Sequence, residues 1–355
     1  MVDVLATIND ITPEWLTAAL QENGQIQSSV TRVDLQPIGA GVGLMAELCR
    51  LVLSYEADEE LPATMIAKCA AQNDNRAVAQ VLDFYHREVN FYNYIGADCL
   101  LNVPSSYYGA VNDETYDCVL LIEDLGDVSP RDQLIGASVD EALSAIERIA
   151  SMHAKWWGKT ESWMYDFMSV TEAGRLKDLV YMPALEPAIE KFADHLDDKN
   201  RALLRTVGEN YAEFWARHVG GEETFIHGDY RQDNMIYSEG SLDAKVMDWQ
   251  ISGSGKGIFD VTYFMCQSLQ PGDRKSIERD ALQMYVAKLA EHGIDYSIDE
   301  AWQDYRRIVL GCLVYPVTVC GTLDLANDRG RALAEAMLTR NLIAIDELDC
   351  AELIS

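Results

Sequence analysis

Basic residues are scarce in this chain of 355 residues. Lysine and arginine together number 28, against 58 aspartate and glutamate residues, so the formal net charge is −30. Such an excess of negative charge repels nucleic acids and anionic membranes, and we expect neither as a partner. It also repels phosphate-bearing ligands, so a site for one of them must supply its own local positive charge.

The chain also lacks paired cysteine motifs and long uninterrupted hydrophobic runs. Its eight cysteines include no C-x-x-C pair, and four lie in apolar runs, as is typical of buried, reduced thiols. The apolar run 308–323 contains Pro316 and is shorter than the roughly 20 residues of a membrane span, so we expect a buried helix. The first residues show no basic segment and no apolar core, which favours a cytoplasmic protein without a signal peptide.

Three polar residues follow or precede short apolar runs in the segment 225–250. Asp229 follows a first run, Asn234 comes five positions later, before a second run, and Asp248 ends a third. Each run is typical of a strand, so we expect these side chains at the ends of adjacent strands. One group that orients a hydroxyl, with an amide and a carboxylate that bind Mg²⁺, is what phosphoryl transfer from ATP requires. The spacing is that of a kinase catalytic loop, and the alternative is a plain polar hairpin.

Several of these residues resemble the pattern of the aminoglycoside phosphotransferase and choline kinase superfamily of small-molecule kinases, namely His227-Gly228-Asp229, Asn234 and Asp248-Trp249-Gln250. The D-W-Q form, with Arg329-Gly330 downstream, is most similar to the ecdysteroid kinase-like (CHK kinase-like) branch. The resemblance covers nearly the whole chain. It implies an α+β, bilobed protein-kinase-like fold: an N-terminal lobe with an antiparallel five-stranded sheet and an αC-type helix, then a larger, mostly helical C-terminal lobe. It also implies an ATP- and Mg²⁺-dependent phosphotransferase with an alcohol group as acceptor.

A glycine-rich loop lies in the N-terminal nucleotide-binding lobe, which we expect to span residues 1–123. Gly39, Gly41 and Gly43 stand between two predicted strands, where backbone N–H groups can approach phosphates closely because no Cβ intervenes. A glycine hairpin turn is the alternative. The segment fits neither a Rossmann motif, since a strand follows it, nor a Walker motif, since no G-K-[ST] is present.

A lysine and a glutamate of the same lobe are predicted to pair. Lys68 interrupts the apolar strand 64–69 and requires an anionic partner, because an unpaired buried ammonium is costly. Glu88 lies on the apolar face of the predicted helix 76–95. We therefore expect a Lys68–Glu88 pair that steadies the ATP phosphates, as the strand-to-αC pair of kinases does. An edge-strand lysine and a surface glutamate are the alternatives.

The resemblance places adenine at the end of the last strand of this lobe, at Leu121, Ile122 and Glu123. Residues 124–355 then form the catalytic and substrate-binding lobe. We expect His153 to be a core histidine and the glycine-rich stretch 252–257 to be a flexible loop. Asp260 begins an apolar helix; its counterpart in relatives steadies the catalytic loop, and a helix N-cap is the alternative.

The resemblance and the chemistry of phosphoryl transfer together assign roles in the catalytic segment. Asp229 would accept or orient the substrate hydroxyl, and His227 would support the loop. Arg231 would neutralise the γ-phosphate, unless it is an exposed loop arginine. Asn234 and Asp248 would bind Mg²⁺, a hard cation that favours oxygen ligands.

The acceptor is the part of the reaction that the motifs leave most open. The aromatic-rich stretch 156–182 and the apolar run beside Tyr315 favour a small-molecule hydroxyl substrate that is lipophilic, sterol-like or a similar alcohol. An aminoglycoside, choline or a hydroxyacyl-CoA remains an alternative acceptor. A non-catalytic nucleotide-binding module, or pseudokinase, is the second class of function. The intact set Lys68, Asp229, Asn234 and Asp248 argues against it.

Overall fold

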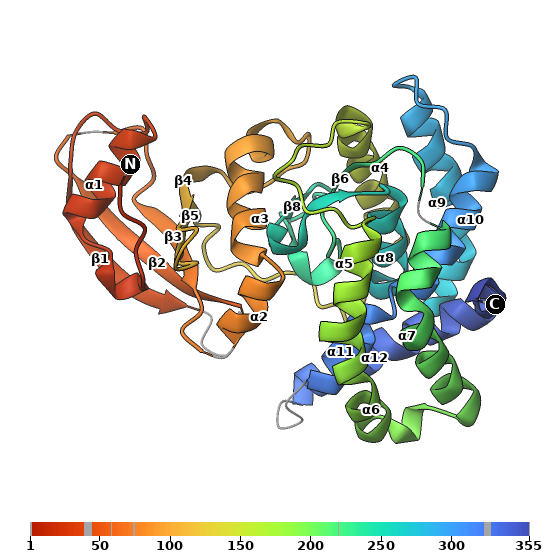
Figure 1. Ribbon diagram of the computed structural model, residues 1–355. Coiled ribbons are helices and arrows are strands. Elements are labelled where there is room, and N and C mark those ends of the chain that lie inside the picture. The colour runs from red at the N-terminus through yellow and green to blue at the C-terminus, as the bar shows by residue number, and fades with distance from the viewer. Residues whose placement is uncertain are drawn as a thin grey trace. The chain divides into compact units, whose positions relative to one another are not determined.

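The computed structural model describes residues 2–38, 45–57, 59–73, 75–218, 220–322 and 328–354. The chain forms two compact units (Figure 1). The first comprises Met1–Val128 together with Val246–Ile251, and the second comprises Ser129–Lys245 together with Ser252–Ser355. The short segment that carries Asp248 therefore belongs to the first unit, although it lies far beyond Val128 in the sequence.

A five-stranded antiparallel sheet forms the first unit, as the sequence predicted (Figure 1). Its strands, in the spatial order β1-β2-β3-β5-β4, are Val30–Ile38 (β1), Ala46–Tyr55 (β2), Thr64–Ala70 (β3), Ser106–Val111 (β4) and Cys118–Glu123 (β5). Neighbouring strands are all antiparallel, and Lys68 of β3 lies opposite Leu48 of β2 and Leu120 of β5. Lys68 is thus held in the central strand of the sheet.

Helix α1 (Pro13–Glu22) packs on one face of this sheet. Thr12 caps it by accepting a hydrogen bond from the backbone N–H of Trp15. Leu16 of α1 is buried in the same cluster as Ala67 and Cys69 of β3. Because successive side chains of a strand point to opposite faces, Lys68 is directed to the other face of the sheet.

The predicted helix 76–95 is divided in the structure. It consists of α2 (Asn75–Val81), α3 (Phe84–Asn90) and a π-helical turn, Phe91–Ile95. The division falls at Asp83, whose φ of 57° is left-handed and cannot continue an α-helix. The predicted apolar face, on which helical spacing places Val81, Tyr85, Glu88 and Tyr92, is only partly correct, because Tyr85, Glu88 and Tyr92 are buried whereas Val81 is exposed.

The second unit is mostly helical, as predicted (Figure 1). Its helices in chain order are Val139–Trp156 (α4), Val170–Leu176 (α5), Met182–Lys191 (α6), Asp198–His218 (α7), Ile258–Ser268 (α8), Pro271–Ala290 (α9), Ile298–Gly311 (α10), Val314–Thr322 (α11) and Asp328–Glu347 (α12). Helix α4 begins with a capping box in which Ser138 and Glu141 satisfy each other's backbone N–H groups. Helix α8 is buried along its whole length.

The short strands within and next to residues 225–250 form two separate pairs. Strand β6 (Thr224–Ile226) pairs with β9 (Gly253–Gly255), and β7 (Met235–Tyr237) pairs with β8 (Ala244–Val246). The expectation that Asp229 and Asp248 follow adjacent strands is therefore wrong, since β6 and β8 belong to different pairs.

The expectation of a flexible loop at 252–257 is also wrong, because β9 is a buried strand. Its glycines are required by close packing. A Cβ on Gly253 would lie 2.3 Å from the backbone oxygen of Tyr165, and one on Gly255 would lie 2.7 Å from a methyl carbon of Ile226. Glycine content here reflects crowding, since only a residue without a side chain fits.

The apolar run 308–323 contributes to two helices, α10 and α11, which are separated at Cys312 and Leu313. Burial of this run is confirmed for most of its described residues. Among the described residues, no helix is long and apolar enough to cross a membrane.

Candidate functional site

The loop that follows β6 is fixed by hydrogen bonds from its backbone to Asp260. This aspartate lies in the first turn of α8 and is fully buried. Its carboxylate accepts hydrogen bonds from the N–H of His227 (2.7 Å) and of Gly228 (2.9 Å). Gly228 has a φ of 80°, a left-handed conformation that favours glycine. The N-cap of α8 is Gly257, so the helix-cap alternative for Asp260 is wrong.

His153 reaches the same carboxylate from α4. Its Nε2 lies 3.2 Å from Asp260, and its Nδ1 lies 3.1 Å from the hydroxyl of Tyr285. The ring is fully buried, so the prediction of a core histidine is confirmed. No local sequence pattern indicates these partners, because they lie on other helices far along the chain.

Asp229 and Asn234 are brought into direct contact by the loop. The side-chain amide of Asn234 donates to the Asp229 backbone oxygen (2.8 Å) and to its Oδ2 (2.9 Å). Asp229 is 8% exposed and Asn234 is 6% exposed, so both are largely buried and a small part of each reaches solvent. In the described part of the chain, no donor contacts Oδ1 of Asn234. That oxygen is available to a ligand.

Arg231 closes the other side of Asp229. Its Nε lies 3.0 Å from Oδ1 of Asp229, while its Nη1 contacts Oε1 of Gln133 (3.2 Å) and Oδ2 of Asp233 (3.3 Å). Burial would lower the pKa of the guanidinium, but the neighbouring groups, with the charge of Asp229 first among them, together outweigh it and raise that pKa. The side chain is only 20% exposed, which disagrees with the alternative of a freely exposed loop arginine.

His227 contacts the backbone of this loop. Its Nδ1 accepts a hydrogen bond from the N–H of Asp229 (3.1 Å), and the residue is fully buried. This nitrogen is therefore engaged in holding the backbone of Asp229. The contact fits a supporting role better than a role in proton transfer.

Lys68 of the first unit lies between two carboxylates. Its Nζ is 2.6 Å from Oε2 of Glu88 in α3 and 3.3 Å from Oδ1 of Asp248. Burial would lower the pKa of the ammonium, but the charges of Glu88 and Asp248 outweigh it and raise that pKa. The structure thus brings together the predicted pair and adds Asp248 as a second anionic partner.

The backbone at Asp248 is in a sparsely populated conformation. Its φ is 63°, which is uncommon for a residue with a side chain, and its side chain is 34% exposed. The next residue, Trp249, is fully buried and stacks on Phe91 of the π-helical turn at a ring separation of 3.7 Å. The stacked ring anchors the chain next to the strained residue Asp248. Strained backbone that is held by its surroundings is common at ligand-binding sites.

The residues predicted to contact the nucleotide base and phosphates are only partly described. Leu121, Ile122 and Glu123 end strand β5, where Leu121 is fully buried and the other two are partly exposed. The backbone N–H of Glu123 donates to the oxygen of Ser105 (2.8 Å). The glycines of the predicted phosphate loop, namely Gly39, Gly41 and Gly43, lie outside the described residues.

A narrow apolar cavity lies in the second unit, lined by residues of or next to α5, α7, α8 and α11. It encloses about 320 Å³ including space open to solvent, and the part that water can occupy holds about one molecule. Its walls are formed by Phe167, Met168, Ala173, Leu176, Tyr211, Trp215, Phe259, Val314 and Tyr315. Tyr315 also donates a hydrogen bond from its hydroxyl to the backbone oxygen of Gly228 (2.6 Å), so the cavity adjoins the loop that carries Asp229.

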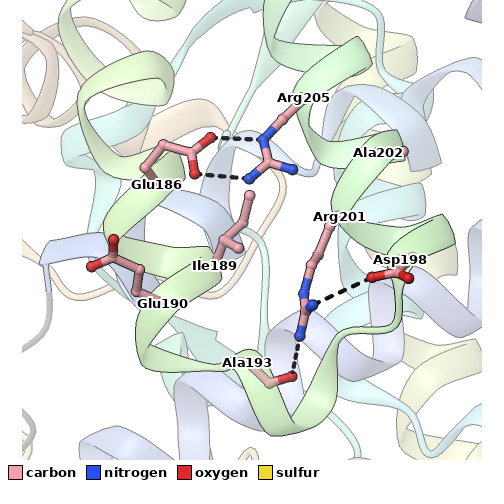
Figure 2. Close-up of a pocket in the computed structure, with 8 residues that line it drawn as sticks. All are labelled: Glu186, Ile189, Glu190, Ala193, Asp198, Arg201, Ala202 and Arg205. Atoms are coloured by element: carbon pink, nitrogen blue, oxygen red, sulfur yellow. Dashed lines mark hydrogen bonds and ion pairs between the residues drawn. The ribbon is translucent and has the colours of Figure 1, made fainter.

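Figure 2 shows a second, shallower hollow on this unit, between α6 and α7. Arg205 donates two hydrogen bonds to Glu186, at 2.8 and 2.9 Å. Arg201 donates to the backbone oxygen of Ala193 (2.9 Å) and lies 3.4 Å from Asp198. Because both guanidinium groups that line the hollow are already paired, it offers little to a phosphate, and we assign it no part in nucleotide binding.

Sequence reasoning missed three residues that shape these groups: Gln133, which contacts Arg231; Trp249, which anchors Asp248; and Tyr315, which contacts Gly228. Trp249 was noted only as part of a motif, and Tyr315 only as a neighbour of an apolar run. The contacts of Gln133 and Tyr315 join positions about a hundred residues apart, and no local pattern indicates such a contact.

Comparison with known proteins supports the fold and identifies the family. The sequence model of the ecdysteroid kinase-like family matches residues 40–296. The solved structure of a microcompartment-associated aminopropanol kinase aligns with a TM-score of 0.56 at 13% identity, covering 96% of this chain and 100% of that chain. Choline kinase from Cryptosporidium parvum Iowa II aligns with a TM-score of 0.54 at 13% identity, covering 96% and 98%.

A protein assigned as an aminoglycoside phosphotransferase from Ralstonia eutropha JMP134 aligns with a TM-score of 0.52 at 15% identity, covering 96% and 98% of the two chains. Identities this low show a shared fold, so the predicted kinase-like fold is confirmed. The comparison with curated protein sequences gave no match. Because the family model covers well over half of the chain, this protein belongs to the ecdysteroid kinase-like family of small-molecule kinase-like proteins.

Proposed function

We propose that the protein is an ATP- and Mg²⁺-dependent kinase that transfers the γ-phosphoryl group to a hydroxyl of a small lipophilic acceptor. The observation that carries this proposal is the placement of Lys68 between Glu88 and Asp248. Phosphoryl transfer depends mainly on positioning and charge neutralisation, and a buried lysine fixed by a glutamate supplies both to the phosphates.

The residues present fit a nucleotide with its metal ion. The ammonium of Lys68 contacts the carboxylates of Glu88 and Asp248. One positive charge cannot balance two negative charges, so the group has room for a further cation. Asp248 is partly exposed, and Oδ1 of Asn234 accepts no hydrogen bond from the described residues. Both offer the oxygen ligands that Mg²⁺ favours. When bound, ATP and its metal would supply the phosphoryl group and the charge that stabilises its transfer.

The remaining residues receive roles that agree with their contacts. Asp229 would orient the acceptor hydroxyl, and His227 would hold the backbone of Asp229. Arg231 would leave part of its contact with Asp229 to neutralise the transferred phosphoryl group. As part of the same proposal, residues 1–123 form the nucleotide-binding lobe and residues 124–355 form the catalytic and substrate-binding lobe.

The acceptor is proposed to be lipophilic, sterol-like or a similar alcohol. The mainly carbon lining of the cavity beside the catalytic loop supports this choice. A polycationic aminoglycoside would need carboxylates around its ammonium groups, and the described residues that line this cavity include no aspartate or glutamate. The cytoplasmic location stays a prediction.

The experiment is a transfer assay with Mg²⁺ and γ-labelled ATP over a panel of acceptors. The panel contains a sterol, a long-chain alcohol, choline, an aminoglycoside and a hydroxyacyl-CoA. We expect label transfer to the sterol or the long-chain alcohol. Transfer only to choline, to the aminoglycoside or to the CoA ester would refute the lipophilic acceptor and keep the kinase. Binding of ATP without transfer to any member would favour a pseudokinase.

A further inference from the structure

Tyr315 belongs both to the wall of the apolar cavity and to the support of the catalytic loop. It lies in the first turn of α11, and its ring packs against Tyr263 at a centroid separation of 4.5 Å. Its hydroxyl donates to the backbone oxygen of Gly228 at 2.6 Å. A group that enters the cavity therefore contacts the Tyr315 ring, and the hydroxyl of this ring is hydrogen-bonded to Gly228, the residue before Asp229.

The bond to Gly228 acts on the peptide unit that leads into Asp229. This unit is planar, so the oxygen of Gly228 and the N–H of Asp229 move together. Tyr315 holds the oxygen, and Nδ1 of His227 accepts from the N–H at 3.1 Å. The preceding peptide N–H is held by Asp260. A glycine at φ 80° has the freedom to rotate this peptide, and the hydrogen bond from Tyr315 restrains it.

The other walls of the cavity would hold an apolar group against the ring of Tyr315. Leu176 and Ala173 of α5 and Trp215 of α7 form parts of the wall contributed by other helices. Water can occupy only a small part of the cavity, so an entering hydrocarbon chain must move some of the surrounding side chains. It gains free energy because its own apolar surface leaves water for an apolar lining. Its lining offers the hydrocarbon part of an alcohol a dry environment and leaves the hydroxyl end toward the loop.

We propose that Tyr315 couples filling of this cavity to the placement of Asp229. The apolar part of the acceptor occupies the cavity and presses on the Tyr315 ring, which keeps the hydroxyl on Gly228 and Asp229 in its productive orientation. Tyr315 is a positioning residue, since it acts through Gly228. The inference rests on the proposed function and adds to it the place of the acceptor and the residue that senses it.

The first experiment tests the cavity without nucleotide or metal. Trp215 lines the cavity, so octanol or dodecanol should change its fluorescence, and the Trp215→Phe variant should lose that change. Leu176→Gln places an amide in the apolar wall and should weaken binding about tenfold. The matched control is Leu179→Gln, three positions along and exposed outside the cavity, which should bind as the wild type does. Equal binding by the two variants would overturn the proposed occupant.

The second experiment tests the coupling in the wild-type and Tyr315→Phe proteins with the acceptor found by the transfer assay. The variant keeps the ring and loses the bond to Gly228, so we expect kcat to fall roughly tenfold to a hundredfold with KM little changed. The control is Tyr181→Phe, which removes a buried hydroxyl that donates to the backbone oxygen of Leu204 and should leave kcat unchanged.

The outcomes separate this inference from the function on which it rests. A Tyr315→Phe variant with wild-type kcat would overturn the coupling and leave the kinase intact. A wild-type protein that binds alcohol but transfers no phosphate would refute the kinase, and the coupling with it. Loss of kcat in the Tyr181→Phe control as well would assign the effect to general destabilisation and would also overturn the coupling.

Discussion

Asp229 is held on two sides by its neighbours in the loop. Asn234 donates to its Oδ2, and the guanidinium of Arg231 lies against its Oδ1. His227 holds its backbone N–H. A carboxylate oriented in this way needs little rearrangement to meet a hydroxyl, which is how preorganised groups lower a reaction barrier.

Replacement of Asp229 by alanine should lower kcat by about 10²- to 10⁴-fold, the usual contribution of a group that orients or accepts a proton. His227→Gln should retain more activity, because a glutamine side chain still offers an acceptor to the loop backbone. Steady-state kinetics on both variants measures the difference. The assignment fails if Asp229→Ala keeps near wild-type turnover or if His227→Gln is the more damaged of the two.

At the scale of residues, the sequence predicted an ion pair between charged side chains in apolar segments. It did not predict hydrogen bonds between uncharged groups far apart in the chain. Lys68 lies in an apolar strand and Glu88 on an apolar helix face, so each needs a counter-ion, and their 2.6 Å contact followed from that cost. Tyr315 and Gly228 are 87 positions apart, and neither has an unsatisfied charge. A tyrosine in an apolar run has the same sequence pattern whether its hydroxyl reaches a loop or water.

At the scale of elements, strands were predicted well because each is a short apolar run that ends at polar or glycine residues. Glycine was the main source of error. The stretch 252–257 looked flexible from its composition, whereas β9 uses glycine because β6 and residue 165 leave no room for a side chain. The left-handed turn at Asp83 was also missed, since aspartate occurs in helices as well as in such turns.

The crowding at β9 makes a specific prediction for stability. A Cβ at Gly253 would lie 2.3 Å from a backbone oxygen, so Gly253→Ala should destabilise the protein by about 1–3 kcal/mol or more. Gly272, in the first turn of α9, has nothing within 4 Å of the same position. Gly272→Ala should therefore be neutral or slightly stabilising. Urea denaturation of both variants provides the measurement, and equal midpoints would contradict the packing argument.

His86 gives α3 a pH-dependent contribution to stability. Its Nδ1 lies 2.6 Å from Asp83 and its Nε2 lies 2.9 Å from Asp113, and the hydrogen bond to Asp83 raises its pKa above the ordinary value. A pKa raised by folding stabilises the protein below the unfolded value of about 6.5, and that contribution is lost as pH rises through the folded pKa.

His86→Gln should thus reduce the free energy of unfolding at pH 5.5 by about 0.5–1 kcal/mol, the range for exposed ion pairs, and have a smaller effect at pH 9. Chemical denaturation at the two pH values measures this. His292→Gln is the control, since His292 is exposed and no ion pair to it occurs among the described residues. A loss that is equal at both pH values would show that the role of His86 is not electrostatic.

At the scale of the whole molecule, the formal charge of −30 opposes the approach of an anionic nucleotide. Salt screens this long-range repulsion, because the Debye length falls from about 30 Å at 0.01 M to about 8 Å at 0.15 M. The buried charges around Lys68 are screened less. The affinity for Mg-ATP should therefore rise with moderate salt, by up to about tenfold.

Calorimetric titration of Mg-ATP at the two salt concentrations tests this expectation, with uncharged adenosine as the control. Adenosine should bind with nearly the same affinity at both. A steady decrease in Mg-ATP affinity with salt would mean that local attraction dominates over the net charge of the protein.

The first unit takes its last six residues, Val246–Ile251, from a part of the chain far beyond Val128. A fragment cut at Val128 would lose Asp248, so Lys68 would keep only one of its carboxylates. It would also lose Trp249, which would leave the ring of Phe91 without its stacking partner. The two units are therefore not separable by a single cut in the chain, and an isolated first unit should fold only when residues 246–251 are joined to residues 1–128.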